Sequence, residues 1–238
     1  MNVKPYSTEG SKREQVERMF DHISPRYDLL NRLLSLGTDQ GWRRKVIRLL
    51  GQEPVGRLLD VATGTADLAL MGARVAEQVT GADISEGMLA QGRRKVEAAE
   101  LSDRITLVQA DAAALPFADA SFDAITVAFG VRNFEDLDAG VAGMVRVLRP
   151  GGRLFVLEFS RPTTFPFKQV FRFYFHRVMP FIGRLVSKDS SAYTYLPESV
   201  DAFPEGPAFE AILRKAGLRE VRRRRLTFGV ATLYLGRK

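Results

Sequence analysis

The residues best suited to chemistry lie in the stretch 58–70, where an apolar run meets an acid and a turn of small residues. Asp60 lies in the apolar run, the turn spans residues 62–66, and Asp67 opens a segment with helical periodicity. A buried strand that enters a helix through such a turn leaves unpaired backbone N–H groups beside an acidic side chain. This arrangement suits a ligand that carries a nucleoside.

The amino-acid sequence of the turn limits which ligands it can bind. A dinucleotide fingerprint, G-x-G-x-x-G, needs three glycines, whereas the turn has only Gly64 and also lacks the Gly-Lys-Ser/Thr ending of a phosphate-binding loop. The pattern D-x-x-x-G-T, from Asp60 to Thr65, resembles motif I of the class I S-adenosylmethionine-dependent methyltransferases. That ligand carries no phosphate, so Gly64 alone suffices for a close approach. The alternative is an ordinary strand–turn–helix of any α/β domain.

The elements that must position these residues alternate between strand and helix. We expect strands at 58–61, 79–82, 105–108, 122–129 and 154–159, with helices at 86–97 and 137–148. Ser85 is well placed to cap the first of these helices. The alternation is typical of a parallel, doubly wound sheet, whose ligands bind at the carboxyl ends of the strands. We therefore expect Asp60, Asp83 and Asp111, which end three strands, to lie on one edge of the sheet.

Each of these acids has a candidate role. Asp83, about twenty residues beyond the turn, is placed to accept both ribose hydroxyls. Asp111 is placed to accept from the adenine amino group, with the backbone N–H of Ala112 on the ring. Asp60 either orients the turn or faces the ammonium group of the ligand. A single acid at a strand end is commonly a cap or turn residue, but three in register with the turn favour a ligand site.

A helical region precedes the first strand. Apolar residues recur at helical spacing at Val16, Met19, Phe20 and Ile23. Ser24-Pro25 is a second start signal, for a helix that ends near Gly37, and Thr38 can cap a third helix. Residues 1–12 have the composition of a loose tail.

Composition excludes several classes of protein. The chain has 238 residues, a net charge of +7, no cysteine and two histidines. Disulfides and thiolate metal sites are thereby excluded, and two histidines supply no metal cluster. The polar N-terminus lacks the apolar core of a signal peptide, and no apolar run approaches the roughly 20 residues of a membrane span. These features favour a cytoplasmic protein. The positive charge suits nucleic acid, an anionic membrane or an anionic substrate without choosing among them.

Four longer segments are more specific than the turn. They are VERMFDHISPRYDLLNRLLSLGTDQGWRR (16–44), ADAAALPFADASFDAITVAFGVRNF (110–134), RVLRPGGRLFVLEFSRP (146–162) and KDSSAYTYLPESVDAFP (188–204). These segments resemble the ubiquinone/menaquinone biosynthesis C-methyltransferase family, and the similarity runs from about residue 14 to the C-terminus. The resemblance implies methyl transfer from S-adenosylmethionine to a ring carbon of a polyprenylated hydroquinone.

The same resemblance implies a fold and a division of the chain. The fold is α/β, a Rossmann-like, mostly parallel seven-stranded sheet with an N-terminal helical region. Its antiparallel C-terminal edge comes from strands at 219–227 and 230–235, after a helix at 209–216. We expect a single domain, residues 1–238, with a helical cap (1–50), a cofactor-binding core (56–160), a substrate lid (161–205) and a C-terminal helix and strands (206–238).

The resemblance also implies cofactor contacts for individual residues. These contacts lie at Thr65, Asp83, Asp111 and Ala112, and the residue-level reasoning above adds Asp60 and Gly64. At Ala128 many members of the family have a serine that touches the cofactor. The missing hydroxyl should cost on the order of 1 kcal/mol of binding free energy, since one hydrogen bond is lost.

Methyl transfer to a ring carbon requires a deprotonated quinol oxygen and a group that stabilises its negative charge. Arg132, directly after the fourth strand, is a fixed cation that we expect near the methyl group. Because arginine stays protonated, its role is electrostatic rather than that of a base. The alternative is a surface ion pair of Arg132 with Glu135 or Asp136.

The proton acceptor is expected to be a water molecule. Asn133 can donate a hydrogen bond to the quinol or orient that water, and Tyr27 or Asp28 could also orient it. For Tyr27 the alternative is packing in the core. Together with Arg132, these residues complete the candidate catalytic set.

The segment 165–185 is rich in aromatic residues that are interleaved with basic ones. It is too short and too charged to span a bilayer, and it could form a lid and a lipid-facing surface that admits an isoprenoid tail. The alternative is an amphipathic helix that closes the cofactor site. His176 within it is expected to pack rather than to act as a base. The basic run 222–225 is either a solvated strand edge or a contact with anionic lipid.

The predicted partners are a polyprenyl hydroquinone substrate and, transiently, an anionic membrane surface. No nucleic acid is predicted, and a homodimer is one option for an oligomeric state that the sequence leaves open. The rival interpretations are a methyltransferase for RNA or another small molecule, and a non-catalytic scaffold protein. The ring, naphthoquinol or benzoquinol, also stays open, although the absence of a long N-terminal extension favours demethylmenaquinol.

Overall fold

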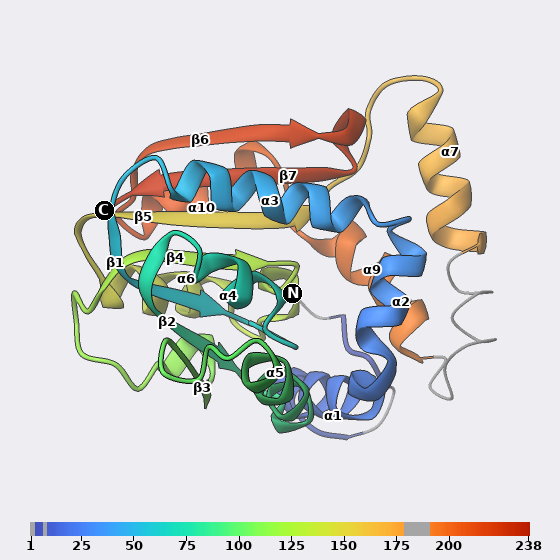
Figure 1. The fold of residues 1–238 in the computed structure, drawn as a ribbon. Coiled ribbons are helices and arrows are strands. Elements are labelled where there is room, and N and C mark those ends of the chain that lie inside the picture. The colour runs from blue at the N-terminus through green and yellow to red at the C-terminus, as the bar shows by residue number, and fades with distance from the viewer. Residues whose placement is uncertain (1–2, 7–8, 179–190) are drawn as a thin grey trace.

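In the part of the chain that the structure describes, seven strands form one sheet (Figure 1). The computed structural model describes residues 3–6, 9–178 and 191–238. The strands are β1 (Val55–Val61), β2 (Ala76–Asp83), β3 (Ile105–Gln109), β4 (Phe122–Ala128), β5 (Leu148–Phe159), β6 (Arg219–Leu226) and β7 (Ala231–Arg237). Their spatial order is β3-β2-β1-β4-β5-β7-β6. β1 to β5 are parallel, whereas β7 is antiparallel to both β5 and β6. The predicted sheet with its antiparallel edge is confirmed.

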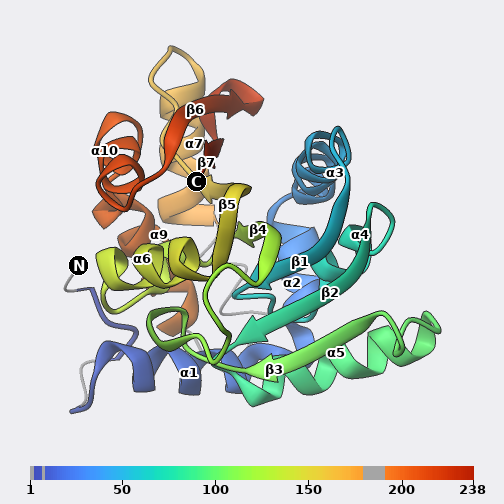
Figure 2. The same ribbon diagram turned by 90° about the vertical axis from the view of Figure 1, so that its left-hand side faces the viewer.

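Helices cover both faces of this sheet (Figure 2). They are α1 (Lys12–Ile23), α2 (Tyr27–Leu34), α3 (Thr38–Leu50), α4 (Asp67–Gly72), α5 (Glu86–Ala98), α6 (Leu137–Val147), α7 (Phe167–Phe173), α9 (Ser191–Ala202) and α10 (Pro207–Lys215). α6 and α10 pack in a hydrophobic cluster on one face, and α3, α4 and α5 contribute to the cluster on the other. β4 is covered on both sides and none of its residues is exposed, as expected for a strand inside a parallel sheet.

Helix α1 begins inside the segment that we predicted as a loose tail. Ser11 Oγ accepts from the N–H of Glu14 at 3.1 Å, and Glu14 Oε2 accepts from the N–H of Ser11 at 2.9 Å. This reciprocal pair is a capping box, which starts the helix at Lys12. The apolar stripe of α1, including Val16, then packs against Met88 of α5.

Two predicted helix caps have different outcomes. Ser85 caps α5, because its Oγ accepts from the N–H of Met88 at 3.1 Å, and this prediction is confirmed. The predicted cap at Thr38 is wrong, since Thr38 is the first helical residue and Gly37 is the N-cap. Gly37 adopts a φ of +72°, a left-handed conformation that glycine reaches without strain. The Thr38 hydroxyl instead donates to the carbonyl of Ser35 at 2.6 Å.

The carboxyl ends of the parallel strands face a group of helices that do not cover the sheet. α2, α7 and α9 lie beyond the arrowheads of β1 and β2 in Figure 1. The site predicted from the strand ends must therefore lie between these helices and the sheet. Within the described residues, no helix has the length and apolar character needed to cross a membrane.

Candidate functional site

Asp60 holds the turn after β1 in place. Its carboxylate is buried and accepts from the hydroxyls of Thr63 and Thr126, each at 2.7 Å. Burial raises the pKa of Asp60 to about 6, although both hydroxyl contacts favour the ionised form. Of the two roles expected for Asp60, these contacts support the orientation of the turn.

Gly64 and Asp83 bring the turn and the end of β2 together. Gly64, at a φ of +56°, donates its N–H to Asp83 Oδ2 at 2.8 Å, and the N–H of Ser85 donates to Oδ1 at 2.9 Å. Burial raises the pKa of Asp83 to about 6, while these two N–H groups act in the opposite direction. Both carboxylate oxygens keep further lone pairs, so an immobilised Asp83 can still accept hydrogen bonds from a ligand.

Asp111 lies at the end of β3 with its carboxylate already oriented. Its Oδ1 accepts from the N–H of Ala113 at 2.9 Å, and Arg13 Nε from α1 approaches Oδ2 at 3.1 Å. Ala112, the first residue of the short turn that Asp111 caps, is buried. Asp111 accepts from the N–H groups of Ala113 and Ala114, so the N–H of Ala112 is the group of this turn that is left to meet a ligand.

A cavity beside these residues gathers most of the predicted cofactor contacts. Its lining includes Gly64, Asp83, Asp111, Ala112 and Ala128. Two fixed carboxylates can accept from ribose hydroxyls and an adenine amino group, and the alanines supply an apolar wall. The residues present therefore fit the adenosine part of S-adenosylmethionine. We call this space the cofactor cavity.

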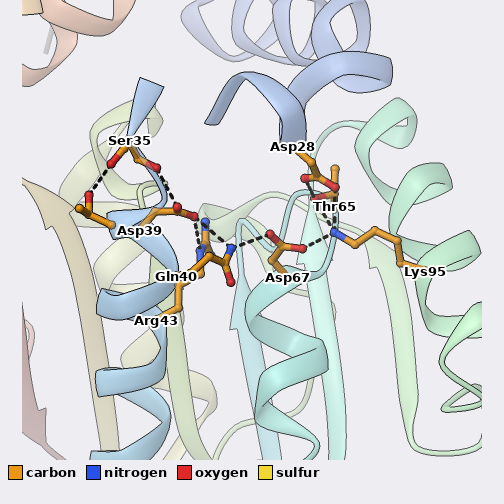
Figure 3. A network of polar contacts seen from close by, with 9 residues as sticks. Asp28, Ser35, Asp39, Gln40, Arg43, Thr65, Asp67 and Lys95 are labelled. Carbon is orange, nitrogen blue, oxygen red and sulfur yellow. Dashed lines mark hydrogen bonds and ion pairs between the residues drawn. The ribbon is translucent and has the colours of Figure 1, made fainter. Parts of the chain in front are cut away.

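Thr65 and Asp28, by contrast, lie outside the lining of the cofactor cavity and bind each other. The Thr65 hydroxyl donates to Asp28 Oδ1 at 2.6 Å, and Lys95 Nζ of α5 donates to Asp28 Oδ2 at 2.9 Å (Figure 3). Lys95 also pairs with Asp67, the first residue of α4. Asp28 therefore joins α2 to the turn and to α5.

The same polar network continues to α3. Gln40 Nε2 lies 3.4 Å from Asp67 Oδ2 and 3.2 Å from Asp39 Oδ2, and Arg43 Nε lies 3.6 Å from that oxygen of Asp39 (Figure 3). Ser35 donates to Asp39 from the loop after α2 at 2.8 Å. The network thus ties two helices of the N-terminal region to the strand–turn–helix around which the site is built.

A second cavity, of about 460 Å³, shares Phe20, Tyr27, Phe129 and Asn133 with the cofactor cavity. Apolar and aromatic side chains make most of its wall: Met19, Phe20, Ile23, Trp42, Phe129, Phe159, Phe167, Val170, Phe171, Phe175, Leu196, Phe228 and Val230. A cavity of this size and character can hold a hydrophobic ring. We call it the apolar cavity.

Arg132 lies in the wall of the apolar cavity and is buried. Its Nη1 donates to Glu158 Oε1 at 2.9 Å, and its guanidinium lies 5.5 Å from the centroid of the Phe159 ring. Glu158 is fully buried, and burial raises its pKa while the Arg132 charge opposes that rise. The pair places a fixed cation beside the cavity without leaving an isolated buried charge.

The expected alternative for Arg132, a surface ion pair with Glu135 or Asp136, is wrong. Glu135 Oε1 accepts from the N–H of Lys12 at 3.0 Å, and Asp136 caps α6. The role of Glu158 was not predicted from the sequence, although the sequence contains an indication of it. An acid in the middle of an apolar strand, as at Glu158, needs a buried cation or donor for a partner.

Tyr27 and Asn133 line both cavities and so lie where the two meet. Burial raises the pKa of Tyr27, which keeps its hydroxyl protonated at neutral pH. The Tyr27 ring also packs edge-on against Phe20, with ring centroids 6.0 Å apart. Tyr27 therefore packs against α1 and also lines both cavities.

The aromatic segment predicted at 165–185 is described as far as residue 178. Phe171 and Phe175 stack with ring centroids 4.6 Å apart, and Phe167 stacks on Phe228 at 3.8 Å. These contacts make α7 part of the wall of the apolar cavity. Residues 179–185 and the side chain predicted to pack at His176 lie outside the described residues.

Comparison with known proteins gives evidence on the family of this chain that does not depend on the geometry of the site. A family model described as the ubiE/COQ5 methyltransferase family matches residues 8–238. A demethylmenaquinone methyltransferase of Bacteroides fragilis is 51% identical over 99% of this chain and 97% of its own length. One from Thermus thermophilus is 52% identical over 92% of this chain and 99% of its own. The ubiquinone/menaquinone biosynthesis C-methyltransferase of Geobacter sulfurreducens is 48% identical, with coverages of 95% and 90%.

Solved structures agree with the fold. An S-adenosylmethionine-dependent methyltransferase from Thermotoga maritima, described as a possible histamine N-methyltransferase, superposes with a TM-score of 0.65 at 17% identity, covering 93% of this chain and 99% of its own. Another from Aquifex aeolicus gives a TM-score of 0.57 at 20% identity, with coverages of 82% and 88%. At such identities the likeness concerns the fold alone.

Proposed function

Because the chain belongs to the ubiE/COQ5 methyltransferase family, we propose that it methylates demethylmenaquinol at a ring carbon to give menaquinol. The chain is an S-adenosylmethionine-dependent C-methyltransferase of quinone biosynthesis. The naphthoquinol ring is supported by the names of the relatives from Bacteroides fragilis and Thermus thermophilus. The benzoquinol of ubiquinone biosynthesis is the second candidate, because the relative from Geobacter sulfurreducens is named for both quinones.

The observation that carries this proposal is the adjacency of the two cavities. The apolar cavity suits a prenylated ring, the cofactor cavity suits adenosine, and Tyr27 and Asn133 line both. A ring held in the first cavity would thus lie next to the reactive end of a cofactor held in the second. Such positioning makes methyl transfer effectively unimolecular, which supplies much of the rate.

In this proposal Arg132 stabilises the negative charge on the quinol oxygen. When bound, S-adenosylmethionine supplies an electrophilic methyl group. The ring carbon becomes a nucleophile once the neighbouring hydroxyl loses its proton, and it later releases its own hydrogen as a proton to solvent. Arg132 stays protonated and favours the deprotonated oxygen, while Glu158 holds the guanidinium in place.

A water molecule takes the hydroxyl proton, and Asn133 and Tyr27 orient that water. Tyr27 acts as a donor, since burial keeps its hydroxyl protonated. For Asp28 the contacts favour another role than the one expected from the sequence. Both oxygens of Asp28 are bound by Thr65 and Lys95, so we propose that Asp28 positions Tyr27, its neighbour on α2.

We further propose that the protein docks on an anionic membrane surface from the cytoplasmic side. Phe165, Phe173 and Phe228 are 81%, 65% and 65% exposed, although large apolar side chains usually avoid water. Phe173 lies on α7, Phe165 lies just before it, and Phe228 stacks on Phe167 of that helix, which also carries Lys168 and Arg172. Apolar side chains mixed with basic ones are typical of a lipid-facing surface. A homodimer stays a prediction.

A methyl-transfer assay with labelled S-adenosylmethionine tests the proposed function. Short-tailed demethylmenaquinol and the corresponding benzoquinol are offered separately to the wild type, Asp83→Ala, Arg132→Ala and a control, Arg161→Ala, which removes an exposed ion pair with Glu205. We expect label in the naphthoquinol. Asp83→Ala should lose cofactor binding, and Arg132→Ala should keep it while turnover falls about 100-fold, as for other lost oxyanion donors. Arg161→Ala should resemble the wild type.

Two results would change the assignment. Label in the benzoquinol alone would replace the naphthoquinol as substrate. A wild type that binds S-adenosylmethionine but labels neither ring would overturn the proposed substrate class. Equal turnover by wild type and Arg132→Ala would remove Arg132 from the mechanism.

A further inference from the structure

Unpaired buried polar atoms gather in one place. Among the described residues, four buried side-chain atoms have no hydrogen-bond partner: Arg43 Nε, Arg132 Nε, Asn133 Oδ1 and Tyr195 Oη. All four residues line the apolar cavity, and each is more than nine-tenths buried. Buried polar groups without partners are rare in native proteins because each costs its desolvation. Four of them in the wall of one cavity indicate a ligand that supplies the missing partners.

The hydrogen-bonding character of these four atoms indicates which donors and acceptors that ligand must have. The two guanidinium N–H groups and the phenol O–H are donors, whereas Asn133 Oδ1 is an acceptor. A hydroquinone offers two oxygens that accept hydrogen bonds and at least one O–H that donates. The set matches such a ring better than it matches a purely apolar lipid, which would leave all four atoms unpaired.

Two members of this set, Arg43 and Tyr195, have no role predicted from the sequence, and the more deeply buried of the two is Tyr195. It comes from α9, is 3% exposed, and packs its ring in the hydrophobic cluster that α1 and α5 share. The charges of Arg132 and Glu158 both act on its hydroxyl, so Tyr195 lies in the neighbourhood of the proposed oxyanion site.

We propose that the Tyr195 hydroxyl donates a hydrogen bond to a ring oxygen of the bound quinol and so sets the orientation of the ring in the apolar cavity. This proposal rests on the proposed function, since it needs a quinol in that cavity. Burial raises the pKa of Tyr195 to about 12, so the group stays protonated and serves as a neutral donor. Arg43 Nε, on the α3 side of the same cavity, is a second donor of this kind, and its partner Asp39 leaves Nε without a hydrogen bond.

The test compares two buried tyrosines. Tyr195→Phe removes the unpaired hydroxyl, and Tyr234→Phe removes a hydroxyl that accepts from the N–H of Gly206 at 2.7 Å. Binding of a short-tailed naphthoquinol is measured with S-adenosylhomocysteine bound, so that no transfer occurs, under anaerobic conditions. The two analogues that each lack one ring hydroxyl are measured in parallel.

We expect Tyr195→Phe to weaken binding of the quinol about tenfold, the usual effect of one buried hydrogen bond. For one of the two analogues the difference between wild type and Tyr195→Phe should vanish, because the acceptor is already missing. The melting temperature of Tyr195→Phe should equal or exceed that of the wild type. Tyr234→Phe should show the reverse pattern, with a lower melting temperature and unchanged quinol binding.

Two outcomes overturn the proposal while leaving the proposed function intact. The first is equal quinol binding by wild type and Tyr195→Phe. The second is a loss of the same size for the quinol and for both analogues, which would mean that Tyr195 acts only through packing. A wild type that binds none of the three rings but still binds S-adenosylhomocysteine would overturn the proposed function itself.

Discussion

The raised pKa of Asp83 predicts that cofactor binding depends on pH. In the proposed site ionised Asp83 accepts the ribose hydroxyls of the cofactor, and its pKa of about 6 means that the carboxylate protonates as the pH falls below that value. We expect the affinity for S-adenosylhomocysteine to be constant above about pH 7 and to fall by up to tenfold per pH unit below pH 6. Calorimetric titrations from pH 5 to pH 8 measure this dependence.

Asp83→Asn is the matched control, because it keeps the shape of the side chain and cannot titrate. Its affinity should be lower at pH 7 and nearly independent of pH, even though Asp60 still titrates near pH 6. An unchanged slope in Asp83→Asn would assign the pH dependence to another group. For folding without cofactor the sign is opposite. Because folded Asp83 holds its proton more tightly than the unfolded chain, its contribution to the unfolding free energy falls as the pH rises from about 4 to about 6.

Residues close together in sequence could be predicted, and residues joined by the fold could not. Gly64, Asp83 and Asp111 were found because a strand end and the turn after it have a local signature. For Arg132 the sequence suggested partners only among its neighbours, as the alternative to the electrostatic role, yet its partner is Glu158, 26 residues away. That pairing depends on the register of β4 with β5, which the amino-acid types of one segment do not specify.

At the scale of elements, the contacts among Asp28, Thr65 and Lys95 predict that α2 depends on Lys95 for its stability. Without Lys95 the carboxylates of Asp28 and Asp67 lose the ammonium group that they share, and like charges remain close together. Lys95→Met should therefore loosen α2, and amide hydrogen exchange over residues 24–34 should become several times faster. Arg94→Met, an exposed change on the same helix, is the control and should exchange like the wild type.

Protection of residues 24–34 that is unaltered in Lys95→Met would mean that packing alone holds α2. A loosened α2 should also raise the KM for the quinol, because Tyr27 and Asn31 of this helix line the apolar cavity. The KM for S-adenosylmethionine should change less, since most of the proposed cofactor contacts lie outside α2, on the turn and at the strand ends.

Most elements could be predicted from sequence because periodicity reports which face of a segment is buried. β1 to β4, α5 and α6 lie close to their expected positions, whereas β5 begins at Leu148, six residues before its expected start at residue 154. The differences lie where backbone geometry or side-chain pairing decides the boundary. Gly37, with its positive φ, displaces Thr38 as the cap of α3, and the reciprocal bonds of Ser11 and Glu14 start α1 earlier than its apolar stripe suggests.

At the scale of the whole molecule, the net charge of +7 and the exposed aromatic residues predict membrane binding. Phe165→Ser with Phe173→Ser removes two exposed apolar side chains that do not line the apolar cavity. We expect flotation with vesicles containing anionic lipid to fall at least fivefold, since each buried aromatic ring contributes about 1.5 kcal/mol or more. Turnover of a short-tailed quinol in solution should stay at the wild-type rate.

Two further measurements separate the apolar contribution to membrane binding from the electrostatic contribution. Vesicles of neutral lipid should bind the wild type weakly, and added salt should reduce binding to anionic vesicles, because screening weakens the attraction of basic residues. If the double variant floats as well as the wild type with anionic vesicles, then the surface around α7 is not the docking surface. The basic run 222–225, for which contact with anionic lipid was one of the two expected roles, would then be the candidate docking surface.

The position of β7 between β5 and β6 has a consequence for synthesis on the ribosome. β6 leaves the ribosome first, yet in the finished sheet its neighbour is β7, which is made after it. A nascent chain therefore passes through a state in which β6 has no strand to pair with. The run Arg222–Arg225 gives that waiting strand four like charges, which discourage it from pairing with the same strand of another nascent chain. The arginines would thus protect the polypeptide during its own translation.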